Sequence, residues 1–205
     1  MWLVVQHVES DLSTTLAEVF QSAGIEPTVC RPFLGDDLPP ADSLTGLVAL
    51  GAPGGAADDD TPHLVRERDL LLHAVLRETP VLGICFGAQL LTVALGGSVQ
   101  RAAHPSTGPG EVYMADGTTM PVMNWHRDEF VPPPGSTVLA RDGHGDPRAF
   151  WFGRNAYGFQ FHAEVDATLA GQVELDAGAS FPDSIVNTTI DAGRALLTRL
   201  IQEST

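Results

Sequence analysis

The sequence contains no lysine: all eleven of its basic residues are arginine, and they face twenty-six acidic residues. A chain without lysine cannot form a lysine Schiff base or complete a P-loop, so both of these chemistries are excluded. The formal net charge of −15 argues against binding nucleic acid through its phosphates. We therefore expect no nucleic-acid partner.

Cysteine and long apolar runs are also scarce. The two cysteines, Cys30 and Cys85, are too few for a disulfide framework, and the N-terminal segment lacks the basic residues of a signal peptide. No apolar run approaches the roughly 18 residues that span a bilayer. The sequence thus predicts a cytoplasmic protein with no membrane partner, and its 205 residues suit one domain over 1–205.

Strands and helices alternate as far as Gly97. Buried strands are expected at 2–6, 28–31, 46–50 and 81–84, and helices at 12–23, from Asp58 to Arg77, and at 86–95. This alternation is typical of a parallel sheet with helices on both faces.

The pattern changes after Gly97. Short strand candidates are separated by glycine, proline and aspartate turns, with little room for helices until a last one within 182–202. The candidates are 99–101, 111–115, 119–123, 137–141, 149–152 and 157–161. They predict antiparallel hairpins added to the sheet in the C-terminal half.

One stretch, Val81 to Leu91, has the form of a buried strand that turns sharply into an apolar helix with Cys85 at the apex. The glycines at 83 and 87 allow close packing around a strained nucleophile, and the helix N-terminus favours the thiolate. Cys85 is therefore a candidate nucleophile. The alternative reading is a small buried core residue, as most free cysteines are.

A nucleophilic cysteine needs a base and a group that orients the base. His162 directly follows an apolar strand, and Glu164 follows at i+2, on the same side of an extended chain. His126 is a second candidate, favoured as a pocket wall. The remaining histidines are expected on the surface or in turns: His7, His63, His73, His104 and His144.

Together these segments resemble the class I, triad-type glutamine amidotransferase domain. The matching segments are Gly83–Gln89 for the nucleophile elbow, Phe159–Glu164 for the His-Pro-Glu segment, Gly51–Gly54 for the oxyanion loop and Asn124–Asp128 for the strand-end loop that holds the amino-acid head of the substrate. The resemblance implies a flavodoxin-like α/β fold. It also implies attack on the γ-amide of glutamine through a cysteinyl thioester.

The same resemblance assigns roles within this sequence. It implies Cys85 as nucleophile, His162 as general acid and base, and Glu164 as the orienting carboxylate. Further roles fall to backbone and pocket residues: the N–H groups of Ala52 and Phe86 for the oxyanion, and Gln89, His126 and Asp128 for the substrate. Two positions depart from the family pattern, since Ala52 replaces a glycine and Ala163 replaces a proline.

No metal or cofactor is expected. The acidic run Asp58-Asp59-Asp60 precedes Thr61-Pro62 and is interpreted as a solvated helix N-terminus, because three adjacent carboxylates cannot all face one ion.

Three functions stay open at this point. The first is a glutaminase that supplies ammonia to a partner synthase, and the second is a γ-glutamyl hydrolase that acts on amides of larger metabolites. The third is a binding module without activity, against which the intact Cys, His and Glu argue.

Overall fold

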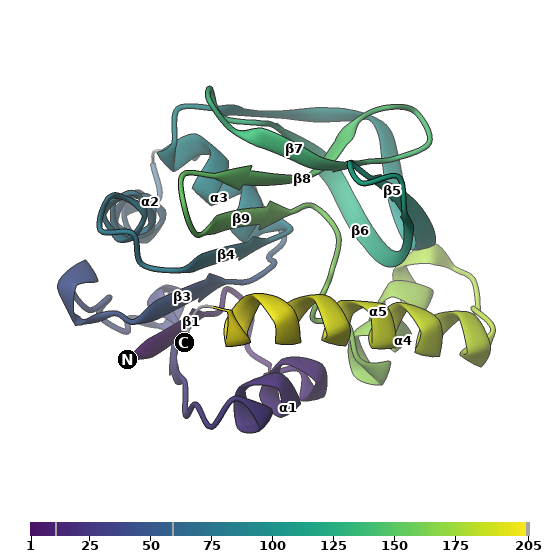
Figure 1. Cartoon of the computed structure of the whole chain (residues 1–205), viewed down its shortest axis with the longest axis horizontal. Helices are drawn as coiled ribbons and strands as arrows, with labels where there is room; N and C mark the ends of the chain where they lie inside the picture. The colour runs from purple at the N-terminus through teal and green to yellow at the C-terminus, as the bar shows by residue number, and fades with distance from the viewer. Residues whose placement is uncertain (11, 59, 204–205) are drawn as a thin grey trace.

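The computed structural model describes residues 1–10, 12–58 and 60–203. Within them, nine strands form one sheet in the order β2-β1-β3-β4-β9-β8-β7-β5-β6 (Figure 1). The first five of these pair in parallel. They are β2 (Thr28–Cys30), β1 (Trp2–Val5), β3 (Gly46–Ala49), β4 (Val81–Ile84) and β9 (Ala156–Phe159).

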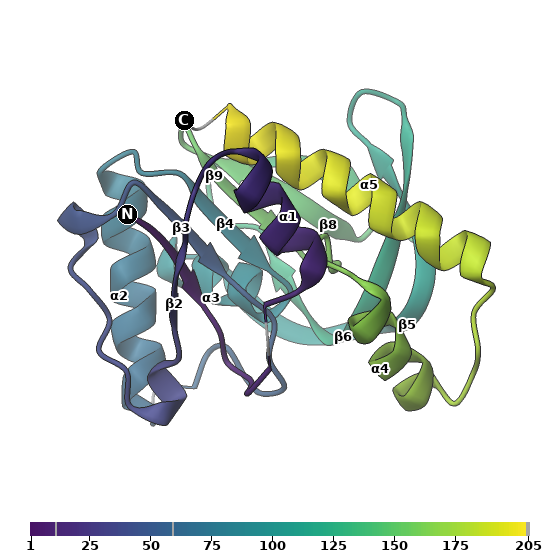
Figure 2. The same ribbon diagram turned by 90° about the horizontal axis from the view of Figure 1, so that it is seen from below.

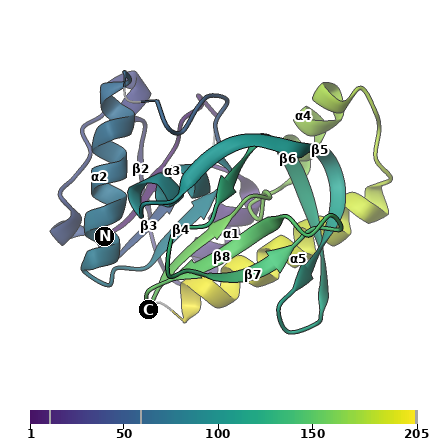
Figure 3. The ribbon, with the colours of Figure 1, turned by 90° about the horizontal axis from the view of Figure 1, so that it is seen from above.

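Helices cover both faces of the parallel part. Helices α1 (Thr14–Ser22) and α5 (Asp183–Gln202) lie side by side on one face, which Figure 2 shows from below. Helices α2 (Pro62–Leu76) and α3 (Phe86–Ala94) lie on the other face, which Figure 3 shows from above. The predicted flavodoxin-like α/β arrangement is confirmed.

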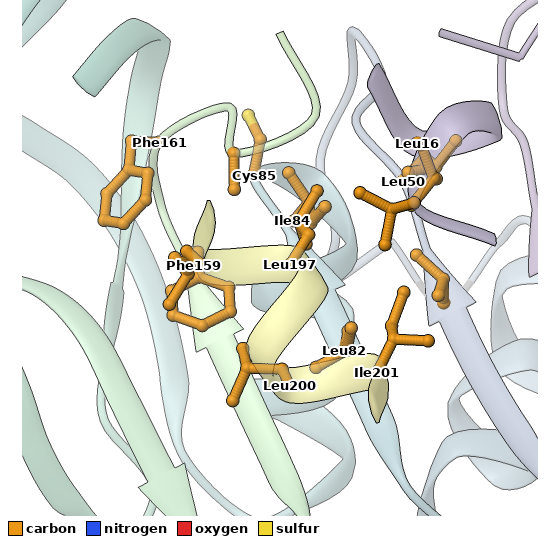
Figure 4. Packing of buried hydrophobic residues seen from close by; sticks show 14 of the residues in the cluster. Leu16, Leu50, Leu82, Ile84, Cys85, Phe159, Phe161, Leu197, Leu200 and Ile201 are labelled. Carbon is orange, nitrogen blue, oxygen red and sulfur yellow. The ribbon is translucent and has the colours of Figure 1, made fainter. Parts of the chain in front are cut away.

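Burial on both faces explains the continuous apolar runs of these strands. In β1, Leu3 and Val5 pack with α2 and α3, whereas Trp2 and Val4 pack with α1 and α5. Side chains alternate across a strand, so a strand covered on both sides is apolar throughout. Figure 4 shows the buried cluster between the sheet and helices α1 and α5, with Cys85 at its end beyond Ile84.

The remaining strands pair antiparallel, as predicted, but three of them are longer than expected. They are β8 (Pro147–Phe152), β7 (Thr137–Arg141), β5 (Ser98–Met114) and β6 (Thr119–Val131). The expected strands 99–101 and 111–115 are one strand, β5, whose register with β6 shifts between Arg101 and Ser106. The prediction that Asn124–Asp128 forms a strand-end loop is wrong, because these residues continue β6 opposite β5.

Helix α4 (Ala167–Ala177) was not expected. Asp166 caps its N-terminus by accepting a hydrogen bond from the Leu169 N–H at 2.9 Å, and Gly178 ends it in a left-handed conformation at φ 63°. The same Asp166 carboxylate accepts from the Thr14 N–H at 2.8 Å, which ties α4 to the start of α1. This helix therefore sits beside the carboxyl ends of the parallel strands.

The acidic run before α2 shapes a turn. The Asp58 carboxylate accepts hydrogen bonds from the Thr61 hydroxyl at 2.6 Å and the Asp60 N–H at 2.9 Å. Asp59 lies outside the described residues. Within the described part of the chain, no three His, Cys, Asp or Glu side chains are grouped to hold a metal ion, and no helix is long and apolar enough to cross a membrane.

Candidate active site

Cys85 occupies the turn between β4 and α3, with φ 51° and ψ −109°. A non-glycine residue in this region is strained by about 1–3 kcal/mol, and such strain is typical of functional sites. Close packing imposes the flanking glycines: a Cβ at position 87 would overlap the carbonyl of Ala49, and one at position 83 would lie 2.7 Å from the Cα of Ala88. The predicted sharp elbow is therefore what this sequence forms.

The sulfur of Cys85 is nearly buried, with the residue 7% exposed. It lies 3.7 Å from the backbone carbonyl of Trp125 on β6, and the Gln160 side-chain amide lies 4.0 Å from it. The backbone N–H of Cys85 donates to the Phe159 carbonyl at 2.7 Å. Strand β9 and the unexpected continuation of β6 thus meet at the sulfur.

His162 and Glu164 lie together, as the i+2 spacing predicted. The imidazole Nδ1 and the Glu164 Oε1 are 2.8 Å apart, in side chains that are 5% and 8% exposed. The other ring nitrogen, Nε2, is buried and has no hydrogen bond among the described residues. A Cβ placed on Gly51 would lie 3.0 Å from the imidazole and 3.6 Å from the Cβ of Cys85, so these two side chains converge beside Gly51.

Burial alone would lower the pKa of His162 by disfavouring the imidazolium. The negative charges of Glu164 and of a Cys85 thiolate, with the hydrogen bond between Nδ1 and Glu164, outweigh burial and raise this pKa well above its usual value. An imidazolium between a carboxylate and a thiolate is the form that activates a cysteine nucleophile. The site is electrostatically suited to that chemistry.

The predicted oxyanion residues flank Cys85. Gly51, Ala52 and Gly54 line the same cavity as the sulfur, and Phe86 begins α3 directly after it. Among the described non-glycine residues, positive φ occurs only at Glu78 and Cys85, so Ala52 has ordinary backbone geometry. Whether these N–H groups receive an oxyanion stays a prediction.

The predicted substrate residues Gln89, His126 and Asp128 line this cavity too, which has a volume of about 660 Å³. The Gln89 amide donates to the Asp128 backbone carbonyl at 3.0 Å, so it braces β6 as well as facing the cavity. The Asp128 carboxylate pairs with Arg101 at 3.2 Å.

His126 is buried, and neither of its ring nitrogens has a hydrogen bond within the described chain. Burial, reinforced by the positive charges of Arg148 and His162, lowers its pKa to about 4. A neutral ring at physiological pH suits the predicted role as a pocket wall.

Several lining residues were missed. His7, expected on the surface, is buried against Glu67 of α2, with Nε2 2.9 Å from the nearer carboxylate oxygen. Asp176 of α4 also lines the cavity, and its carboxylate accepts a hydrogen bond from the Trp125 indole at 2.9 Å. The signal for His7 was its place directly after a buried strand, the same position that marked His162.

Comparison with known proteins agrees with this geometry. The family model of class I glutamine amidotransferases matches residues 5–180. The chain belongs to the class I glutamine amidotransferases. A solved glutamine amidotransferase from Thermotoga maritima superposes on it with a TM-score of 0.82 at 27% identity, over 99% of this chain and 95% of that one.

Curated relatives place this glutamine amidotransferase chain near two kinds of protein. It is 35% identical to a GMP synthase [glutamine-hydrolyzing] of Aeropyrum pernix over 74% of its own length and 30% of that protein. It is 31% identical to the putative glutamine amidotransferase-like protein YfeJ of Salmonella typhimurium, over 65% of this chain and 63% of that protein. The chain thus spans less than two thirds of these relatives.

Proposed function

We propose that residues 1–205 form one catalytic domain that hydrolyses the γ-amide of glutamine through a thioester on Cys85. The observation that carries this proposal is the convergence of a strained Cys85 and a buried His162–Glu164 pair in one cavity. Family membership supports the reaction class.

In the proposed mechanism, His162 Nε2 takes the proton of the Cys85 thiol, and the thiolate attacks the γ-carbonyl carbon. The N–H groups of Ala52 and Phe86 receive the oxyanion, and His162 then protonates the departing ammonia. A water molecule deprotonated by His162 cleaves the thioester and releases glutamate. Glu164 stays ionised and holds the imidazole.

The substrate head would bind along β6. The Asp128 carboxylate supplies a negative charge for an α-ammonium group, and Gln89 fixes the backbone of the same segment. His126 stays uncharged there above about pH 4 and shapes the wall.

The released ammonia needs an acceptor close by, since in water at neutral pH it is mostly protonated and no longer nucleophilic. Residues 1–205 contain no lysine and no P-loop, so they lack the nucleotide-binding device that would most simply activate an acceptor. We infer that a synthase outside these residues receives the ammonia. The likeness to a glutamine-hydrolysing GMP synthase supports such a partner and leaves its identity open.

The size of the cavity favours a second candidate, a γ-glutamyl hydrolase. Beyond Cys85, the space of about 660 Å³ extends to Thr168, Leu169 and Gln172 around α4, and to the segment after β1. Such a volume lies within the range that holds drug-sized ligands, so a γ-glutamyl amide larger than glutamine would fit.

A release assay separates these functions. Wild-type protein and Cys85→Ala would be compared on free glutamine and on a series of γ-glutamyl amides, with and without an added synthase. Ammonia release from glutamine that a synthase accelerates would support the first function. Fast hydrolysis of a larger amide, with little action on glutamine, would favour the second, and no turnover of any compound would leave only a binding module.

A further inference from the structure

A second histidine–glutamate pair lies beside the cavity. His7 follows β1, Glu67 belongs to α2, and their side chains are 5% and 1% exposed. Nε2 of His7 donates to both carboxylate oxygens of Glu67, at 3.0 and 2.9 Å. A carboxylate that is hydrogen-bonded to one ring nitrogen fixes the orientation of the imidazole, and Glu164 is bonded to His162 in the same way.

The ring held in this way meets Phe86. The centroids of the His7 and Phe86 rings are 5.0 Å apart, with the planes at 70°. Phe86 is the residue whose N–H is proposed to receive the oxyanion, and a Cβ on Gly54 would lie 4.0 Å from its ring. The Phe86 ring therefore contacts the imidazole and lies near Gly54, in the loop that carries the other oxyanion donor.

The next residue of α2 holds the far end of that loop. Arg68 is 8% exposed, and its Nη1 donates to the backbone carbonyl of the fully buried Ala56 at 3.1 Å. Burial of charged side chains costs free energy unless they are hydrogen-bonded, so two consecutive buried charges on one helix require specific partners. Glu67 is hydrogen-bonded to His7, which contacts Phe86, whereas Arg68 is hydrogen-bonded directly to Ala56 at the end of the loop.

We propose that His7 and Glu67 are positioning residues that hold Phe86 and the loop from Gly51 to Ala56 in the conformation that receives the oxyanion. This inference rests on the proposed function. An oxyanion hole works only if its N–H groups are fixed at hydrogen-bond distance from the developing charge, and a displacement of about 1 Å can cost about 10²-fold in rate.

The test uses two variants of the intact chain. His7→Ala alone would leave Glu67 buried without a partner, so the double variant His7→Leu with Glu67→Leu removes the pair and its charge together. His7→Gln keeps an N–H donor for Glu67 but loses the ring that meets Phe86. His73→Ala is the matched control, since His73 is exposed on α2, the helix of Glu67, and its one hydrogen bond among the described residues is with the Asp69 carbonyl one turn earlier.

Two rates are measured for each protein. Hydrolysis of γ-glutamyl p-nitroanilide requires the oxyanion hole, whereas alkylation of Cys85 by iodoacetamide is a displacement at a saturated carbon and forms no oxyanion. We expect kcat to fall about 10- to 100-fold in the double variant and about tenfold in His7→Gln, with KM within about threefold. Alkylation of Cys85 should stay within about twofold, and His73→Ala should match wild type in both rates.

Each remaining outcome counts against the proposal. Wild-type kcat in either variant of His7 would overturn it while leaving the proposed function intact. An equal fall in kcat and in alkylation would also overturn it, because a general loss of structure lowers both. If wild-type protein hydrolyses no γ-glutamyl compound, the proposed function fails and this inference fails with it.

Discussion

Cys30 and Cys85 occupy equivalent places at the carboxyl ends of two parallel strands. Cys30 is the last residue of β2 at the edge of the sheet, and Cys85 follows β4 in its centre. They are 4% and 7% exposed, and each sulfur lies 3.7 Å from a backbone carbonyl, that of Asp37 or that of Trp125. Burial and hydrogen bonding therefore do not distinguish the two thiols.

The charged residues near Cys30 and Cys85 distinguish the two thiols. Burial, with added negative charge from Asp36, Glu67 and Asp37, raises the pKa of Cys30 to about 11. Cys85 instead faces His162, whose pKa is raised by Glu164 and by the thiolate itself. We expect this difference, an imidazolium beside Cys85 and carboxylates beside Cys30, to make Cys85 the nucleophile and to leave Cys30 inert.

The strongest test of this contrast removes each sulfur in turn. Cys85→Ala should lower turnover by about 10³-fold or more, since the attacking group is lost, while the melting temperature stays near that of wild type. Cys30→Ser should keep turnover within about twofold. Full activity in Cys85→Ala would refute the assignment of the nucleophile.

Alkylation by iodoacetamide at pH 7, followed by mass spectrometry of the two cysteine peptides, measures the contrast directly. Cys85 should react about 10²-fold faster than Cys30, whose pKa of about 11 leaves little thiolate at this pH. As pH rises from 7 to 10, the rate at Cys30 should increase about tenfold per unit, because deprotonation is the limiting requirement. A pH-independent rate at Cys30 would contradict this account.

Changing Glu164 should reduce the difference in reactivity between Cys85 and Cys30 without abolishing it. Glu164→Gln should retain about 10- to 100-fold more activity than His162→Ala, because an amide still orients the ring but stabilises the imidazolium less. The pKa of His162, followed by NMR titration, should fall in this variant. Equal activity in the two variants would argue against an orienting role for Glu164.

The same change alters the dependence of stability on pH. A raised folded-state pKa means that the His162 proton contributes fully to stability below its unfolded value of about 6.5, and that this contribution is lost as pH rises through the folded-state pKa. Glu164→Gln should flatten this part of the curve of unfolding free energy against pH, measured by urea denaturation.

The smallest expected effect concerns the loop beside Cys85. Ala52→Gly restores the glycine that the family pattern has at this position and widens the conformations open to the loop. We expect about two- to threefold higher basal glutaminase activity, with an unchanged rate of Cys85 alkylation. A decrease in basal activity would show that Ala52 does not limit the loop.

The parallel half of the fold could be predicted from the sequence because its signals are local. The strand Val81–Ile84 was predicted with its observed bounds. The turn at Cys85 was predicted from the glycines on either side of it. The pairing of His162 with Glu164 was predicted from their i+2 spacing, although these residues lie in a turn after β9 and not in extended chain as expected. In each case the partners lie within a few residues or in adjacent strands.

The rest depended on contacts that the sequence does not display. The family resemblance placed residues 124–128 in a loop, yet they belong to β6 because β5 pairs with most of them, and Trp125 to Asp128 line the cavity. Helix α4 buries only Ala170 and Val173, so its apolar periodicity is too weak to predict a helix. Its two capping residues, Asp166 and Gly178, were nevertheless recognisable in the sequence. His7 depends on Glu67, a partner sixty positions away.

Strands β4 and β9 are neighbours in the sheet, paired from Val81 with Ala156 to Ile84 with Phe159, although all of β5 to β8 lies between them in the sequence. Closing so long a loop costs entropy that only completed packing repays, so contacts of this kind tend to form late in folding. We therefore expect Cys85 in a growing or half-folded chain to react as an ordinary thiol, because His162 does not yet lie beside it. High reactivity at this sulfur should appear only when the fold is complete. The rate of Cys85 alkylation would then report how far folding has progressed.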